Sequence, residues 1–137
     1  MPKTSDKKGR VQPGIDKETK ESMEYIKENS PFFRDYEEFS KFDNADLFRL
    51  GVAITVKNIK TLKLEPHPSS VGANSGGQTW GRSSLDIDPS LTKMVEFLID
   101  EKDREEIWSY IERAAKTGIK YLHKQVKLDK DLSEIFE

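Results

Sequence analysis

The chain has 137 residues, which fits one domain of ordinary size. Its 23 basic and 25 acidic residues give a formal net charge of -2, which excludes a uniformly basic protein held to nucleic acid by bulk charge. With no cysteine, the chain has no disulfide, thiolate zinc site or cysteine nucleophile, and this composition fits a cytoplasmic protein.

No apolar run approaches the roughly 18 residues that a membrane helix needs. The first residues also lack the apolar core of a signal peptide. We therefore expect a soluble, cytoplasmic protein without a membrane partner. The two histidines have no short ligand spacing and no motif-supported serine or carboxylate partner, so the sequence predicts no metal site, no cofactor and no catalytic residue.

Residues 1–14 hold four basic residues against one acidic residue, together with two prolines and two glycines. Such a segment buries too little apolar surface to offset its ordering entropy. We expect a disordered basic tail over 1–14, serving as a solubilising arm or touching phosphates, and a single domain over 15–137.

Residues 16–29 predict a surface helix with a narrow apolar stripe. Ser30 and Pro31 favour a second helix start, because serine caps free N–H groups and proline is tolerated at the first helical position. Phe32, Tyr36 and Phe39 then recur at helical spacing. We expect these rings in the core. The alternative is that the aromatic residues of 32–42 recognise another protein.

Residues 44–58 form the most apolar window and predict the central buried helix, capped by Asp43 or Asn44. Its β-branched half, Val52 to Val56, is also compatible with a strand. Residues 60–65 alternate apolar and charged side chains, which predicts a short strand paired with residues 83–87.

A loop rich in Gly and Ser is expected over 66–84. Residues 72–79 match the spacing of a phosphate-binding loop except that Gln78 replaces the lysine, which removes its main positive charge. Long loops in small domains often carry function. The loop is thus a candidate ligand site formed by four side chains: His67, Trp80, Arg82 and Asp86.

Two more helices are expected in the last third of the chain. Asp88 and Pro89 open an amphipathic helix that reaches Ile99. A longer helix over 103–127 carries an apolar seam of Ile107, Ile111, Ala114, Gly118 and Leu122. Because Ala114 and Gly118 are four residues apart, another helix can approach closely there. Residues 131–136 add a last turn.

Five cations of the 103–127 helix form what we term the basic stripe: Arg113, Lys116, Lys120, Lys124 and Lys127. At about 100° per residue, this stripe lies opposite the apolar seam and is expected to face solvent. One interpretation is contact with nucleic-acid phosphates. The other is complementarity to the helix dipole, because acidic residues occupy the first turn of the same helix.

Residues 46–58, DLFRLGVAITVKN, and the pattern Ala115-x-x-Gly118-Ile119-x-x-Leu122 resemble a family of small helical proteins associated with DNA phosphorothioate modification (Dnd-type) gene clusters in bacteria and archaea. The resemblance covers about a third of the chain, and the 69–84 loop departs from it. It implies an accessory to DNA modification or host defence, and it brings no catalytic residues.

We expect a mainly α domain of four to five helices with a short two-stranded ribbon. The leading functional hypothesis is a non-enzymatic accessory or adaptor protein that associates with DNA or with another protein, or forms an oligomer. The alternatives are a small ligand-binding domain or enzyme with its site in the 66–88 loop, and a regulatory module that binds another protein.

Overall fold

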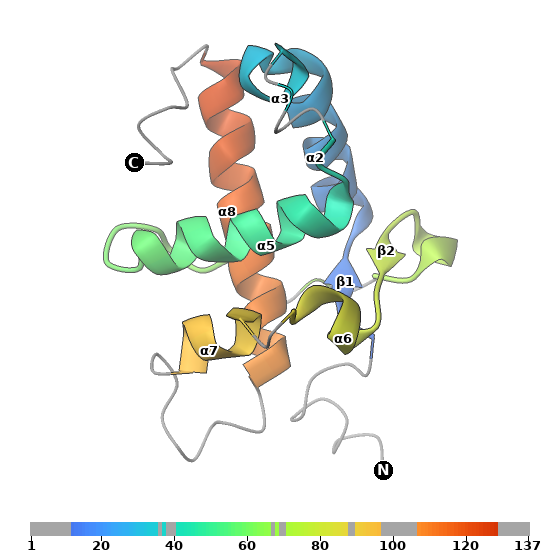
Figure 1. Cartoon of the computed structure of the whole chain (residues 1–137), viewed down its shortest axis with the longest axis vertical. Helices are drawn as coiled ribbons and strands as arrows, with labels where there is room; N and C mark the ends of the chain where they lie inside the picture. Colours follow the sequence, from blue (N-terminus) through green and yellow to red (C-terminus); the bar gives the residue numbers. More distant parts are fainter. Residues whose placement is uncertain are drawn as a thin grey trace.

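A computed structural model describes residues 12–35, 37, 41–66, 68, 71–87, 90–96 and 107–128. The fold is mainly α, as predicted, and the described residues contain six α-helices and one two-stranded sheet (Figure 1). The helices are α2 (Lys17–Asn29), α3 (Pro31–Asp35), α5 (Asn44–Lys57), α6 (Arg82–Leu85), α7 (Ser90–Glu96) and α8 (Ile107–Lys127). The short elements are the 3₁₀ turn η1 (Ala73–Ser75) and the strands β1 (Gly14–Ile15) and β2 (Gln78–Thr79).

Helix α5 is the predicted central helix, and the strand alternative for its second half is wrong. The side chain of Asp43 accepts from the Asp46 N–H, and the Asp46 side chain accepts from the Asp43 N–H, forming a capping box. Leu47, Phe48 and Val52 are fully buried. Burial on the faces of this helix outweighs the strand preference of its β-branched residues.

Helix α5 crosses α8 at a point where both helices carry glycine (Figure 1). A Cβ on Gly118 would overlap the carbonyl oxygen of Gly51, and a Cβ on Gly51 would lie 2.7 Å from the Ala115 carbonyl oxygen. The Thr55 hydroxyl also donates to the Ala114 carbonyl oxygen over 2.6 Å. The close helix approach predicted at Ala114 and Gly118 is therefore confirmed.

Helix α2 lies beside α8 and the two run in the same direction (Figure 1). The Asp16 carboxylate caps α2 by accepting from the Thr19 N–H over 2.9 Å. Met23 and Ile26 are fully buried. This pairing brings the exposed side of α2 next to the basic stripe of α8.

The aromatic residues after α2 belong in part to the core. Phe33 is only 2% exposed, and its ring centroid lies 5.5 Å from that of Phe32 and 6.0 Å from that of Phe42. This agrees with the core interpretation for Phe33. Tyr36 and Phe39 lie outside the described residues.

The predicted sheet pairing is wrong. The sheet joins β1 to β2, with Gly14 opposite Thr79, whereas 60–65 is not a strand and Arg82–Leu85 is helical. The Glu65 N–H donates to the Thr117 hydroxyl over 2.8 Å, so α8 supplies the bonding partner that a neighbouring strand would have supplied.

Three residues of the expected tail, residues 12–14, belong to the described part of the chain. Pro13 and Gly14 are buried, and the Gly14 N–H donates to the Glu112 carboxylate over 2.8 Å. Residues 1–11 of the expected tail lie outside the described residues, as do the beginning of the 103–127 helix, residues 97–99 of the helix before it, and the 131–136 turn.

The loop expected over 66–84 contains regular structure in its second half. Gly76 adopts a left-handed φ of 86° after η1, a conformation that glycine reaches without strain, and the chain then enters β2.

No helix among the described residues is long and apolar enough to cross a membrane.

Candidate functional site

Three of the four side chains expected to form a ligand site in the loop contact different helices. Trp80 packs edge-on against Phe48 at 5.5 Å between ring centroids, and the Arg82 guanidinium carbon lies 5.4 Å from the centre of the Trp108 ring. His67 lies outside the described residues.

The Asp86 carboxylate is engaged elsewhere, at the start of α7. It accepts from the Thr92 N–H over 2.9 Å and from the Thr92 hydroxyl over 2.6 Å. Trp80, Arg82 and Asp86 thus contact α5, α8 and α7 respectively. Each of these contacts holds the loop to the helices.

The inner half of the basic stripe, Arg113 and Lys116, is built into the fold. The Arg113 Nε–H donates to the Glu65 carbonyl oxygen over 2.9 Å. The Lys116 ammonium lies 2.9 Å from the Asp16 carboxylate, and its side chain is only 11% exposed. The expectation that the whole stripe faces solvent is wrong at Lys116, because the first turn of α2 covers this side of α8.

The contact with Lys116 stabilises the ionised form of the Asp16 carboxyl group. Burial alone would raise its pKa, but hydrogen bonds from Thr19 and Lys116 outweigh burial and hold the pKa of Asp16 below its usual 3.8. The ion pair therefore ties the start of α2 to the middle of α8 at neutral pH.

Lys120 marks the change from buried to accessible cations. Its ammonium lies 3.4 Å from the Glu65 carboxylate and 3.6 Å from the Glu18 carboxylate, and its side chain is 40% exposed. Burial would lower the pKa of Lys120, yet the attraction of Glu65 and Glu18 outweighs it and raises the pKa above 10.5. Lys120 stays charged at any physiological pH.

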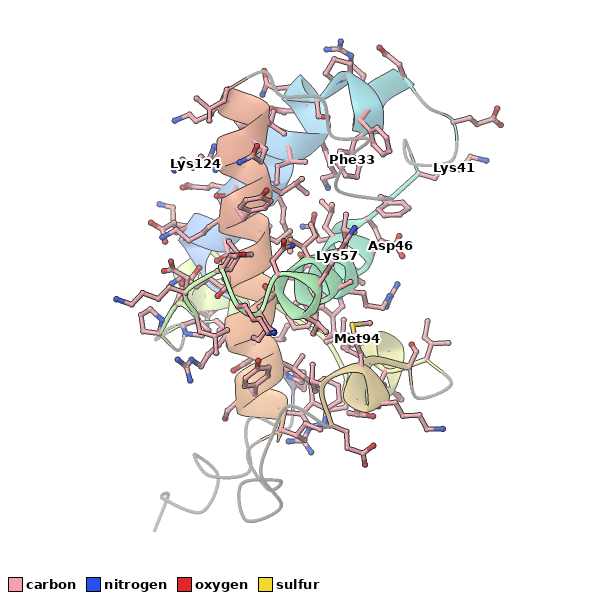
Figure 2. The ribbon with its side chains drawn as sticks, turned by 90° about the vertical axis from the view of Figure 1, so that its left-hand side faces the viewer. Phe33, Lys41, Asp46, Lys57, Met94 and Lys124 are labelled. Atoms are coloured by element: carbon pink, nitrogen blue, oxygen red, sulfur yellow. The ribbon has the colours of Figure 1, made fainter. Side chains whose placement is uncertain are left out.

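The outer half of the stripe is Lys120 together with Lys124 and Lys127. Both Lys124 and Lys127 are exposed, and Figure 2 labels Lys124 near the upper end of α8. The Lys127 ammonium lies 6.0 Å from the centre of the Tyr25 ring. Within the described parts of the chain, no carboxylate forms an ion pair with Lys124 or Lys127. With respect to the described residues, these two exposed cations are accessible to an external anion.

A solvent-open cavity of about 290 Å³ lies between α2 and α8 at this point. Its lining combines three cations with one carboxylate, one hydroxyl and one imidazole: Lys120, Lys124, Lys127, Glu18, Ser22 and His123. The net positive charge of the lining favours a small anion over a cation.

His123 forms part of the cavity wall. Its Nδ1 lies 2.7 Å from the Ser22 hydroxyl oxygen, and its ring stacks at a tilt on Tyr25 at 4.6 Å between centroids. Its buried Nε2 has no hydrogen-bond partner among the described residues. Burial, and next the charge of Lys127, lower the pKa of His123 below 6.5, so the ring is neutral at pH 7.

The Ser22 and His123 pair lacks the geometry of a hydrolytic site. Ser22 is only 5% exposed, and its hydroxyl lies against His123 at the wall of the cavity. No carboxylate of the described chain orients the Nε2 side of the ring. The pair instead fixes the spacing of α2 and α8. No three histidine, aspartate or glutamate side chains within the described ranges gather to hold a metal ion.

Sequence reasoning found the lysines of this cavity and missed Glu18, Ser22 and His123. His123 carries a usable signal, since it lies three residues after Lys120 and four before Lys127 on the same helix face. Glu18 and Ser22 carry no such sequence signal. They lie beside α8 only because α2 packs parallel to it, and the two helices are far apart in the sequence.

No protein-family model matches the chain, and no curated protein or solved structure matches it either.

Proposed function

We propose that this protein is a non-enzymatic accessory protein that binds the phosphate backbone of DNA through the outer half of the basic stripe. The observation that carries the proposal is the convergence of Lys120, Lys124 and Lys127 on one solvent-open cavity. Cations that line one cavity attract phosphates more strongly than the same cations spread over a near-neutral surface.

The inner half of the stripe is left out of the proposed contact surface. Arg113 and Lys116 already bind the Glu65 carbonyl oxygen and the Asp16 carboxylate. Using them for DNA would break contacts that hold α2 and the 60–65 segment to α8. The proposed footprint is therefore short, of about two or three phosphates.

The resemblance to small proteins of Dnd-type gene clusters points in the same direction. It supports a role beside DNA modification or host defence, in which the chain places a partner on DNA rather than performing chemistry. The residues behind the resemblance are packing residues: Gly118 lies at the α5–α8 crossing, and Leu122 is fully buried.

The test is a gel shift on duplex DNA at several salt concentrations. The variant Lys124→Glu/Lys127→Glu removes two exposed cations, and the slope of log affinity against log salt should fall by about two. Lys60→Glu/Lys93→Glu is the matched control, because it reverses two exposed charges that do not line the cavity. Lys93 belongs to α7, which packs near the opposite end of α8 (Figures 1 and 2). The proposal is wrong if the wild type does not bind at low salt, or if the double variant and the control behave alike.

The other two functions expected from the sequence gain no support from the described residues. The loop side chains contact separate neighbours, and Phe33 of the aromatic segment is buried in the core. A ligand site in the loop needs convergent side chains, and a docking surface needs accessible rings.

A further inference from the structure

We infer that the cavity between α2 and α8 binds a single phosphate group, at a position that we term the phosphate seat. The bound phosphate displaces the Glu18 carboxylate from Lys120. The inference deepens the proposed function and rests on it for the identity of the phosphate carrier, DNA. It differs from a diffuse basic surface because it assigns one anion position with defined neighbours.

The Glu18 carboxylate lies where the phosphate would bind, but its contacts with the neighbouring lysines are weak. One carboxylate oxygen, Oε1, lies 3.9 Å from the Lys116 ammonium and 3.6 Å from the Lys120 ammonium, and the Glu18 side chain is 63% exposed. Both distances exceed the 2.7–2.9 Å of a strong charge-assisted hydrogen bond. An exposed pair at this separation contributes little, so an incoming anion displaces it easily.

A phosphate group suits this exchange. Inorganic phosphate or a phosphate monoester brings more negative charge and more acceptor oxygens than Glu18, whereas a DNA phosphodiester brings the same single charge with two free oxygens. For either group, Lys124 and Lys127 line the cavity beside Lys120. The volume of about 290 Å³ lies at the small end of ligand cavities. This volume accommodates one phosphate group together with water.

Lys120 remains neutralised when Glu18 leaves, since Glu65 stays 3.4 Å away. The exchange gives up the 3.9 Å contact between Glu18 and Lys116 and leaves the 2.9 Å pair between Lys116 and Asp16 in place. Glu18 thus competes with the anion for Lys120, while Asp16 continues to hold α2 to α8.

The charged groups around the His123 ring are Lys120, Lys124 and Lys127 on α8 and Glu18 on α2, with the Tyr25 ring stacked on it. A bound phosphate adds negative charge beside this ring and favours its protonated form. The titration of His123 consequently reports whether the seat is filled.

The experiment is an NMR titration of the full chain with inorganic phosphate, compared with sodium chloride at equal ionic strength. Phosphate should give saturable shifts of the His123 and Ser22 signals, and the His123 midpoint should move to higher pH. A His67→Gln variant assigns the two histidine signals. Shifts that are equal in phosphate and chloride, or that do not saturate, overturn the inference.

Two matched variants separate the seat from general electrostatics. Glu18→Gln should tighten phosphate binding by about two- to fivefold, the range expected from removing one exposed competing charge. Glu24→Gln changes the same charge at an exposed position of α2 that does not line the cavity, and it should leave binding unchanged. Equal effects of the two variants overturn the inference.

The outcomes for DNA and phosphate are distinguishable. DNA binding without saturable phosphate binding overturns the phosphate seat and leaves the proposed function standing. Saturable phosphate binding without a gel shift supports the seat, overturns DNA as its carrier, and assigns the site to free phosphate or a small phosphorylated molecule. Circular dichroism of each variant verifies that the fold is unchanged.

Discussion

Single residues of the basic stripe divide according to the carboxylates that face them. Lys116 is 11% exposed and lies 2.9 Å from Asp16, whereas Lys124 is exposed and forms no ion pair within the described chain. The sequence shows five cations at equivalent helical positions and contains no signal for this division. It arises because α2 runs along the stripe but presents carboxylates to it only at its first turn, Asp16 and Glu18, and presents Ser22 and Tyr25 further along.

His123 provides a prediction about pH and stability. Because its pKa in the folded state lies below 6.5, the unfolded chain takes up a proton before the folded chain does. The free energy of unfolding should therefore fall as the pH drops through 6.5 and level off below the folded-state pKa of His123.

Urea unfolding at about pH 7.5 and about pH 5.5, on either side of the usual histidine pKa, measures this loss. The variant His123→Gln should lose less stability than the wild type over the same interval. His67→Gln is the control, since it removes the other histidine. A wild-type pH dependence that survives His123→Gln unchanged contradicts the prediction.

At the scale of elements, the α5–α8 crossing is the part of the fold that the sequence predicted best. The small residues Ala114 and Gly118 lie within a strongly periodic apolar seam, so the face and the closeness of the contact follow from spacing alone. The identity of the partner glycine, Gly51, does not follow, because the crossing point depends on how two whole helices pack.

The variant Gly118→Ala tests this crossing. Alanine favours an isolated helix by about 1 kcal/mol over glycine. Its Cβ would overlap the Gly51 carbonyl oxygen, and backbone displacement in a packed core costs typically about 1–3 kcal/mol. We expect net destabilisation, seen as a lower midpoint in thermal or urea unfolding.

Gly72→Ala is the matched control, because a Cβ at Gly72 meets no atom within 4 Å and its φ of -65° suits any residue. Its midpoint should stay at the wild-type value. A Gly118→Ala protein as stable as the control would mean that the helices do not cross at this point.

The pairing of the two-stranded sheet could not be predicted from the sequence. Strands β1 and β2 have two residues each, too few to display an alternating pattern, whereas 60–65 displays one without being a strand. The β1–β2 pairing depends instead on the buried Glu112 carboxylate, which accepts from the Gly14 N–H. A lone glutamate on a helix gives no sequence signal for such a role.

At the scale of the whole molecule, Glu112 links the first described residues to α8. Replacing it should therefore lower the free energy of unfolding of the whole domain. The variant Glu112→Ala leaves the buried Gly14 N–H without this acceptor, which costs about 1–3 kcal/mol. Chemical denaturation measures the loss, and Glu112→Gln should recover part of it by accepting through its amide oxygen. Equal stability of the alanine variant and the wild type contradicts the assigned role.

Three contacts between the start of the described chain and α8 join residues 98, 100 and 101 positions apart: Gly14 with Glu112, Asp16 with Lys116, and Ser22 with His123. Contacts of such high sequence separation form only after a large entropic cost of loop closure has been met. The cavity between α2 and α8 therefore exists only in the fully closed topology. An anion bound in this cavity stabilises only the folded chain, so its binding adds to the free energy of unfolding of the whole domain. Occupancy of one small surface site therefore lowers the frequency of global unfolding.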